Sequence, residues 1–177
     1  MAGISRILFS LVIMALCFGT ATGADPAPAA KDVSVVFSPK GGCVAALVAG
    51  IATAKKSIRV QAYSFTHPDI YQALIAAHKR GVDVQVILDR SYLSSAPGAA
   101  NALRQAEVAV LIDSKHQIAH NKVTIIDDTA VFTGSFNYTR QAESSNAENL
   151  ITITARDVVL QFFNNWESHA GHSKPLP

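Results

Sequence analysis

Strand-like and helix-like segments alternate along most of this chain, and that alternation restricts the fold more than any other feature. Strand-like apolar runs occupy residues 32–38, 57–65, 82–89, 108–113 and 149–155, with a hairpin-like stretch over 120–137. Helical patterns occupy residues 42–56, 67–81, 97–106 and 155–170. This order predicts a single-domain α/β fold, in which a mixed β-sheet is flanked by helices on both faces as an α-β-α sandwich.

The first 23 residues have the layout of a secretory signal peptide. Arg6 supplies a positive start, residues 7–18 form an uncharged apolar run, and Ala21 and Gly23 are small residues suited to a cut after Gly23. The run is too short for a membrane-spanning helix of ~20 residues. A retained membrane anchor and a lipoprotein anchor on Cys17 are the alternatives. We expect export, to the periplasm or the medium, with no stable membrane insertion after cleavage.

The mature chain is expected to have a flexible extension over residues 24–31 and one domain over residues 32–177. Cys43 is its single cysteine, so no disulfide can form within one chain. A buried inert thiol is the favoured state of Cys43, and an interchain bridge is the alternative. Removing Arg6 lowers the formal net charge from +2 to +1. That balance neither requires nor excludes a polyanionic partner, so any attraction must come from local clusters of charge.

The stretch HNKVTIIDDTAVFTGSFN, residues 120–137, places polar side chains where a half-buried hairpin would ordinarily carry apolar ones. Side chains alternate between the faces of a strand, so His120 shares a face with Lys122, and Ser135 with Asn137. A two-residue loop at 128–129 predicts that Lys122 pairs with Ser135, and His120 with Asn137, all on one face. A three-residue loop would instead turn one strand's set to the other side.

An imidazole, an ammonium, a hydroxyl and a carboxamide on one face suit a phosphodiester. Lys122 supplies a point charge to a phosphate oxygen, and Ser135 and Asn137 donate hydrogen bonds to other oxygens. His120 is then free to attack phosphorus or to transfer protons. The face has no second carboxylate and no cluster of histidine, cysteine or aspartate at metal-ligand spacing, so we expect no metal and no cofactor.

The alternative without a functional site is that this stretch forms a solvated polar strand face. Glu148 argues against it, because this carboxylate precedes the strand-like run 149–155. From there it could accept a hydrogen bond from His120 and fix the tautomer of the ring.

These residues together resemble the phospholipase D superfamily. HNKVTIID (120–127) fits the H-x-K-x4-D motif of that family, GSFN (134–137) follows at the expected distance, and AENL (147–150) supplies the glutamate. The segments QAYSFT (61–66) and RGVDVQVILD (80–89) are also similar to the family. A small protein with a single copy of the motif is most similar to the bacterial Nuc-type endonucleases.

The resemblance implies a metal-independent phosphodiesterase that acts through a covalent phosphohistidine. His120 would be the nucleophile, Glu148 would orient an active-site histidine, and the phosphate ligands would be Lys122, Ser135 and Asn137. The resemblance therefore implies that His120, Lys122 and Glu148 are catalytic, and that the domain over residues 32–177 is the catalytic domain.

Asp127 belongs to the motif but is expected to support the site rather than to act in it. It lies seven residues from His120, an odd separation, so on a regular strand it faces away from the phosphate. Its expected work is to hold the turn or to pair with a basic neighbour.

A single motif supplies one histidine, whereas the reaction needs two. The leaving oxygen must receive a proton from a second acid, which later acts as base on the attacking water. None of the other histidines repeats the lysine spacing, although His116 is a weak candidate; they are His67, His78, His116, His169 and His172. A homodimer whose twofold axis brings two copies of His120 to one site is the expected solution.

Nucleic acid is the expected substrate, with DNA first and RNA as an open alternative. The chain is small, and scattered basic residues could follow a phosphate backbone without reading bases; they are Lys55, Lys56, Arg59, Arg90, Arg104, Lys115 and Arg140. The first alternative is a phospholipase D or cardiolipin-type lipid phosphodiesterase. The second is a binding module that holds a phosphodiester without cleaving it.

Overall fold

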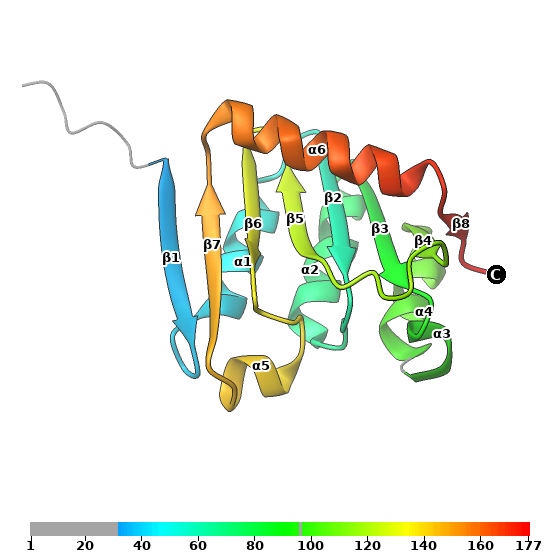
Figure 1. Ribbon diagram of the computed structural model, residues 1–177, viewed down its shortest axis with the longest axis horizontal. Coiled ribbons are helices and arrows are strands. Elements are labelled where there is room, and N and C mark those ends of the chain that lie inside the picture. The colour runs from blue at the N-terminus through cyan, green and yellow to red at the C-terminus, as the bar shows by residue number, and fades with distance from the viewer. Residues whose placement is uncertain (1–31, 96) are drawn as a thin grey trace, which may run out of the picture. The chain divides into compact units, whose positions relative to one another are not determined.

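A computed structural model of the protein describes residues 32–95 and 97–177, so the predicted signal peptide and the extension over 24–31 lie outside the described residues. The described strands form one mixed sheet in the order β1-β7-β6-β5-β2-β3-β4-β8 (Figure 1). The strands are β1 (Val33–Ser38), β2 (Ser57–Ala62), β3 (Asp83–Asp89), β4 (Ala109–Asp113), β5 (Lys122–Ile126), β6 (Ala130–Gly134), β7 (Glu148–Ile153) and β8 (Lys174–Pro175). The helices are α1 (Cys43–Thr53), α2 (Pro68–Lys79), α3 (Tyr92–Ser95), α4 (Pro97–Gln105), α5 (Arg140–Ser144) and α6 (Arg156–Ala170).

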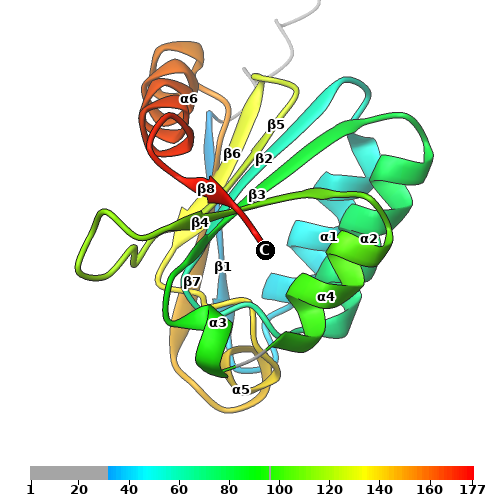
Figure 2. The ribbon, with the colours of Figure 1, turned by 90° about the vertical axis from the view of Figure 1, so that its right-hand side faces the viewer.

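Helices cover both faces of the sheet, and the predicted α-β-α sandwich is confirmed. Helices α1, α2 and α4 lie on one face and α6 lies on the other (Figure 2). The α6 face is anchored by Trp166, which is buried and donates a hydrogen bond of 3.0 Å from Nε1 to the carbonyl oxygen of Val60 in β2. The predicted strands and long helices are all present. The short elements α3, α5 and β8 are additions from the structure.

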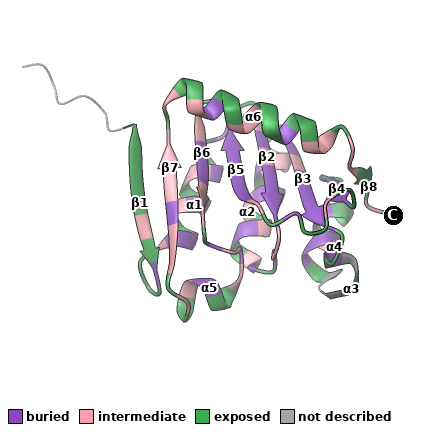
Figure 3. Ribbon diagram, in the orientation of Figure 1, coloured by how far each residue is buried: buried purple, intermediate pink, exposed green. Residues whose placement is uncertain are grey.

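Burial follows the position of each strand in the sheet (Figure 3). All five residues of β5 are buried, because β5 is central and both of its faces are covered. The edge strand β1 is different, since α6 does not reach it. Val33, Val35 and Phe37 therefore remain 53%, 47% and 60% exposed.

The register of the β5–β6 hairpin differs from the predicted one. Val123 pairs with Thr133, and Ile126 pairs with Ala130. The connecting loop therefore has three residues, 127–129, and the predicted pairing of Lys122 with Ser135 is wrong. One extra loop residue turns Thr133 to the face opposite Lys122, as expected for a shift of one position in a strand.

The conformation of the turn explains this register. Asp127 and Asp128 both have positive φ angles, 51° and 54°, and the N–H of Thr129 donates a hydrogen bond of 3.0 Å to the carbonyl oxygen of Ile126. Aspartate tolerates the left-handed region better than most residues. The sequence DDT therefore forms a tight turn centred on Asp127 and Asp128, one position earlier than the predicted loop, and Thr129 follows as the third loop residue.

Strand β6 ends at Gly134, which removes Ser135 and Asn137 from the alternation of the strand. The φ angle of Gly134 is 148°, and a Cβ atom there would lie 2.4 Å from the carbonyl oxygen of Asn149. Beyond it, Phe136 is fully buried in the core on the α1 and α2 face. Ser135 and Asn137 are thus placed by a segment that leaves the sheet.

Most of the polar strand ends lie along one side of the sheet, the side that runs across the strands at their ends. Strands β2, β3 and β4 are parallel, and they end there at Ala62, Asp89 and Asp113. Strands β5 and β7 run the other way and begin there, at Lys122 and Glu148. We call this side the carboxyl edge. In α/β sheets, binding sites form at the carboxyl ends of the parallel strands.

Candidate active site

His120 and Lys122 lie together where β5 begins. The Nζ atom of Lys122 is 3.2 Å from Nδ1 of His120 and donates a hydrogen bond of 2.8 Å to the His120 carbonyl oxygen. Tyr63, directly after β2, packs against both. Its ring centroid lies 4.5 Å from that of His120 and 5.3 Å from Lys122 Nζ. The only sequence signal for Tyr63 is its place in the segment 61–66.

Lys122 and His120 differ sharply in exposure. His120 is exposed to solvent, whereas Lys122 is only 6% exposed. Burial lowers the pKa of Lys122 because it disfavours the charged ammonium, and the negative charge of Glu148 opposes that shift. The ammonium contacts a ring nitrogen, a carbonyl oxygen and an aromatic face, all uncharged. A phosphate oxygen would give this cation a direct counter-charge.

Ser135 and Asn137 reach the same edge along the segment that follows Gly134. Ser135 is exposed, and its Oγ accepts a hydrogen bond of 3.1 Å from the N–H of Asn149. The next residue after Asn137, Tyr138, donates from its N–H to the carbonyl oxygen of Ser64 at 3.0 Å. Asn137 therefore lies beside the segment that carries Tyr63.

The side chain of Asn137 has an unused polar atom. Its Oδ1 is buried and has no hydrogen-bond partner among the described residues. Amide oxygen and nitrogen exchange places by a half-turn of the carboxamide, so the same position can present the Nδ2 donor. A phosphate oxygen is a suitable acceptor for that donor, and a buried polar atom without a partner is uncommon enough to require an explanation.

Glu148 lies at the carboxyl edge, but it does not bind His120 within one chain. Its Oε1 accepts a hydrogen bond of 3.1 Å from Nδ2 of Asn146, and no hydrogen bond joins it to His120 in the described part of the chain. The hydrogen bond considered for these two side chains is therefore not formed in a single copy. The charge of Glu148 acts instead on Lys122, whose protonated form it favours.

Asp127 lies at the opposite edge of the sheet. Its Oδ1 accepts from the N–H groups of Lys56 and Ser57 at 2.7 and 2.9 Å, and its Oδ2 accepts from Lys55 at 2.8 Å. Burial works to raise the pKa of Asp127, but these three donors outweigh it and hold the pKa below its ordinary value. Asp127 thus ties the β5–β6 turn to the start of β2 and cannot touch a substrate bound at the carboxyl edge.

Comparison with known proteins settles the family. A family model described as a cardiolipin synthase, PLD-like domain, matches residues 47–169. The chain belongs to the phospholipase D superfamily. It is 44% identical to a phospholipase D of Rickettsia prowazekii, over 78% of this chain and 67% of that protein. It is 33% identical to a mitochondrial cardiolipin hydrolase of Xenopus laevis, over 70% of this chain and 60% of that protein.

Solved structures of the superfamily share the fold. The structure of Nuc from Salmonella typhimurium, a phospholipase D family member, matches with a TM-score of 0.76 and 36% identity, over 81% of this chain and 97% of that one. NucT from Helicobacter pylori matches with a TM-score of 0.74 and 26% identity, over 81% and 98%. The predicted family and the predicted enzyme class are confirmed: this protein is a phosphodiesterase of the phospholipase D superfamily.

The basic residues expected to follow a phosphate backbone divide between the two edges of the superfamily domain. Asp127 binds the backbone of Lys55 and Lys56 at the opposite edge, and Arg59 pairs there with Asp83 at 2.5 Å. Arg104 lies in the last turn of α4, shortly before the start of β4, also toward that edge. The remaining three lie at the carboxyl edge, together with Lys40; the basic residues there besides Lys122 are Lys40, Arg90, Lys115 and Arg140.

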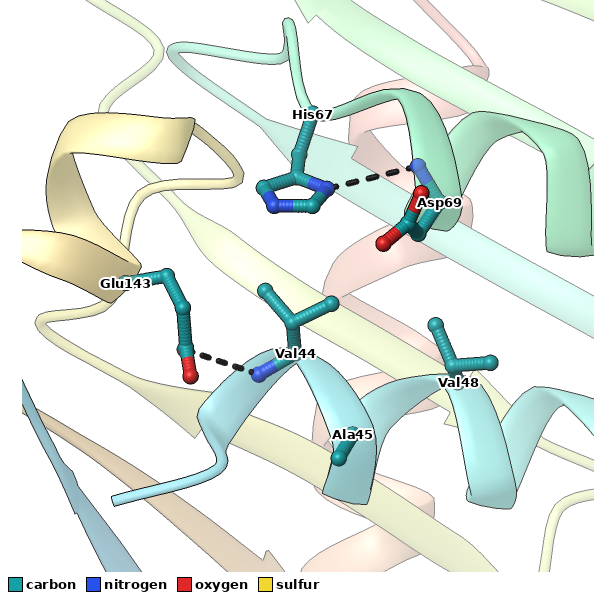
Figure 4. A pocket seen from close by; sticks show the side chains of 6 residues that line it. All are labelled: Val44, Ala45, Val48, His67, Asp69 and Glu143. Atoms are coloured by element: carbon teal, nitrogen blue, oxygen red, sulfur yellow. Dashed lines mark hydrogen bonds between the residues drawn. The ribbon is translucent and has the colours of Figure 1, made fainter. Parts of the chain in front are cut away.

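A pocket of about 460 Å³ opens at the carboxyl edge, between the first turns of α1 and α2 and helix α5 (Figure 4). Glu143 from α5 accepts a hydrogen bond of 3.0 Å from the N–H of Val44, and His67 accepts one of 3.3 Å from the N–H of Asp69. Burial lowers the pKa of His67 and so favours its neutral form. With two carboxylates on its wall, this pocket suits a phosphate less well than the surroundings of the Lys122 ammonium do.

The structure also gathers three of the remaining histidines, a grouping missed by the sequence analysis. His116, His169 and His172 surround the buried carboxylate of Asp113 at the end of β4. Two short patterns could have indicated it, the Asp-x-x-His of residues 113–116 and the His-x-x-His of residues 169–172. Their separation along the chain hid the cluster. His116 contacts Asp113 and is not held against His120 by any hydrogen bond of the described residues.

Proposed function

We propose that this phosphodiesterase is an exported, metal-independent, non-specific endonuclease that cleaves DNA through a covalent phosphohistidine at a site shared by two copies of the chain. One observation carries the proposal. The exposed imidazole of His120 and the buried ammonium of Lys122 meet at the carboxyl edge, with Nζ 3.2 Å from Nδ1, and basic residues stand on both flanks of that edge.

The reaction proceeds in two displacements. A nitrogen of His120 attacks phosphorus and forms a P–N bond, while the P–O bond to the leaving sugar oxygen breaks and that oxygen takes a proton from a second, protonated imidazole. The second imidazole, now neutral, then accepts a proton from water. The resulting hydroxide attacks phosphorus, the P–N bond breaks, and His120 is regenerated. Lys122, Ser135 and Asn137 hold the phosphate oxygens in both steps.

The second imidazole is the His120 of another copy. Two exposed apolar side chains flank the site and support this arrangement. Ile118, two residues before His120, is 55% exposed. Phe37, 60% exposed, pairs across β1 and β7 with Asn149, whose N–H binds Ser135. A twofold partner over this edge buries both side chains and brings the two imidazoles together.

Glu148 acquires a role in the same arrangement. It does not bind His120 within one chain, yet it lies on the edge that the partner covers. In the dimer it accepts the ring N–H of the other copy of His120 and fixes the tautomer in which the opposite ring nitrogen is free to attack phosphorus.

The likeness to the solved structures of Nuc and NucT, together with the distribution of charge, favours DNA as the substrate. Lys40 and Arg140 lie on the β1 side of the site, and Arg90 and Lys115 lie on the β4 side. A backbone that crosses the edge would meet cations before and after the scissile phosphate. These contacts read phosphates rather than bases, so cleavage should be non-specific.

A lipid phosphodiester is the second candidate. Relatives named phospholipase D and mitochondrial cardiolipin hydrolase favour it, and so does the exposed Ile118 beside the nucleophile. In the described part of the chain, no helix has the length and apolar character needed to cross a bilayer.

One assay separates the candidates. The purified protein and its His120→Ala variant are incubated in EDTA with plasmid DNA and with vesicles of labelled cardiolipin, at a temperature where circular dichroism shows both proteins folded. We expect the wild-type protein alone to nick and linearise the plasmid. Cleavage of lipid alone would establish the second candidate, and tight DNA binding without product would establish a binding module. DNA cleavage that EDTA abolishes and Mg²⁺ restores would refute the metal-independent mechanism.

A further inference from the structure

The cluster around Asp113 brings three imidazoles to one carboxylate oxygen. Oδ2 of Asp113 lies 2.8 Å from Nδ1 of His116, 2.9 Å from Nδ1 of His169 and 3.3 Å from Nε2 of His172. The four atoms all lie within 4.8 Å of one another. Asp113 is fully buried, and the side chains of His169 and His172 are 14% and 19% exposed. The cluster is thus built into the fold.

Hydrogen bonding alone accounts poorly for this convergence. A carboxylate oxygen offers about two lone-pair directions, and three ring nitrogens compete for Oδ2. The other oxygen is already occupied, because Oδ1 accepts from the N–H groups of Lys115 and His116 at 3.0 and 3.3 Å. Those two bonds turn Oδ2 toward the rings, in the way that outer partners orient a ligating carboxylate.

We propose that Asp113, His116, His169 and His172 form a binding site for a divalent transition-metal ion, with Zn²⁺ as its preferred occupant. In a tetrahedral zinc site with bonds of about 2.0–2.1 Å, neighbouring ligand atoms lie roughly 3.3 Å apart. The 2.8–3.3 Å between Oδ2 and the three nitrogens is close to that value. Three imidazoles and one carboxylate suit Zn²⁺, and also Co²⁺, Ni²⁺ and Cu²⁺, whereas Mg²⁺ and Ca²⁺ prefer oxygen ligands alone.

The ion in this site is structural. Four protein ligands fill a tetrahedral zinc ion, so none of its positions remains open for water or substrate. The ligands join three separate segments: the end of β4, the loop before β5 and the end of α6. That loop continues to His120, and its Ala119 N–H is held by Asp89 Oδ2 at 2.7 Å. The metal therefore fastens the C-terminal helix to the loop that presents the nucleophile.

The test uses the full-length protein without a polyhistidine tag. After dialysis against EDTA and then metal-free buffer, Zn²⁺ and Mg²⁺ are titrated in separate calorimetric experiments, and metal content is measured after gel filtration. We expect one Zn²⁺ per chain, no saturable binding of Mg²⁺ and a raised unfolding temperature in Zn²⁺. The Co²⁺-loaded protein should show the intense visible absorption of tetrahedral cobalt.

Variants of the proposed ligands test where the ion binds. His116→Gln and His172→Gln each remove one nitrogen and should weaken Zn²⁺ binding by at least about tenfold. His116 is the more exposed of the two, at 43% of its side chain, so its variant should stay folded even if the other does not. His120→Asn is the matched control, expected to bind Zn²⁺ as the wild type does while losing hydrolysis.

The outcomes for the metal site and for the proposed nuclease are independent. A wild-type protein that takes up no Zn²⁺, or His116→Gln and His172→Gln variants that bind it as well as the wild type, would overturn the site. Loss of Zn²⁺ from His120→Asn would overturn it too, because the ion would then belong to the reaction centre. Failure to cleave DNA would refute the proposed function and leave the metal result unchanged.

Discussion

The burial of Lys122 is the strongest structural reason to regard the sequence motif as a binding site. A lysine that is 6% exposed at the start of a central strand has lost most of its hydration, and its ammonium makes two polar contacts with His120. Such a group stabilises the fold poorly, which is a reason to assign it to ligand binding. The exposed imidazole beside it can reach a phosphate held by that ammonium.

Replacing the imidazole should therefore remove activity and leave the fold intact. We expect His120→Ala to lower the rate of phosphodiester cleavage by at least ~10³-fold, because it removes the attacking nitrogen. His120 is exposed, so the free energy of unfolding should change by no more than about 0.5 kcal/mol. Initial rates and urea denaturation measure the two quantities. A variant that retains near-wild-type rates would exclude His120 as the nucleophile.

The balance of charge at Lys122 predicts how binding depends on pH. The Lys122 amine must be protonated to hold a phosphate, and burial lowers its pKa from the ordinary value of about 10.4. Affinity for an oligonucleotide, measured on the inactive His120→Ala protein, should fall as pH rises through that lowered value. Glu148→Gln removes a charge that favours the ammonium, so the fall should move to lower pH.

Glu143→Gln is the matched control for that experiment. Glu143 is another carboxylate of the carboxyl edge, but it is not among the groups that shift the pKa of Lys122. Its variant should keep the wild-type pH dependence of binding. Equal pH profiles for the Glu148→Gln variant and its parent would show that Glu148 does not act on Lys122.

Turnover should have a narrower pH range than binding. The mechanism needs one neutral and one protonated imidazole at the same time, so the rate should follow a bell-shaped curve. Steady-state rates across the neutral range measure it. A flat profile there would contradict catalysis by two histidines.

At the scale of elements, the β5–β6 hairpin depends on Asp127. Asp127→Asn keeps the size of the side chain and its tolerance of positive φ, but it weakens three charge-assisted hydrogen bonds. We expect the free energy of unfolding to fall by about 2 kcal/mol at neutral pH, measured in urea. Asp128→Asn, in the same turn, is exposed and should change it by no more than about 0.5 kcal/mol.

The sign of the acid dependence follows from the lowered pKa of Asp127. Its folded pKa lies below the unfolded value of about 3.9, so its stabilisation is complete above that unfolded value. It is lost as pH falls through the lower folded pKa. The difference between wild type and Asp127→Asn should therefore shrink in strong acid, and a constant difference would rule out the carboxylate as the cause.

The same hairpin shows where sequence patterns stop being informative. Apolar runs and helix boundaries predict the strands and long helices, because each pattern is local. The register does not follow from such a pattern, since DDT can form a two-residue or a three-residue loop. Packing of Phe136 in the core, and not strand alternation, sets the positions of Ser135 and Asn137. The short helix α5, five residues long, leaves too small a pattern to detect.

At the scale of the whole molecule, the proposed shared site requires two copies. Sedimentation should report twice the mass of one chain. Ile118→Glu places a charge beside His120 in the proposed interface, so it should yield monomers whose cleavage rate falls by about 10²-fold or more. Leu160→Glu is the matched control, because Leu160 is equally exposed, at 56% against 55%, but lies on α6 near the opposite edge. A fully active Ile118→Glu monomer would refute the shared site.

The division of charge between the edges gives a second prediction at this scale. Arg90→Ala and Lys115→Ala, at the carboxyl edge, should each weaken DNA binding and reduce the salt dependence of affinity by about one phosphate contact. Lys55→Ala and Lys56→Ala, at the opposite edge, should change neither. Binding measured between low and moderate salt tests this, and equal effects at both edges would remove the proposed path of the backbone.

Two groupings made by distant segments were not predicted from the sequence. The Asp113 cluster combines the end of β4 with the end of α6, and only the packing of α6 across the sheet brings them together. The same limit applied to the basic residues, whose division between the edges depends on the direction of each strand.

The outer side of β1 has a consequence for how the protein behaves at high concentration. Among the described strands, β1 has a hydrogen-bonded neighbour on one side only, and β8 shields the far end of the sheet at just Leu111 and Ile112. Free backbone N–H and C=O groups beside Val33, Val35 and Phe37 form a template for a foreign strand. Concentrated solutions should therefore tend toward ribbons joined strand to strand, and a lysine or proline introduced into β1 would suppress them.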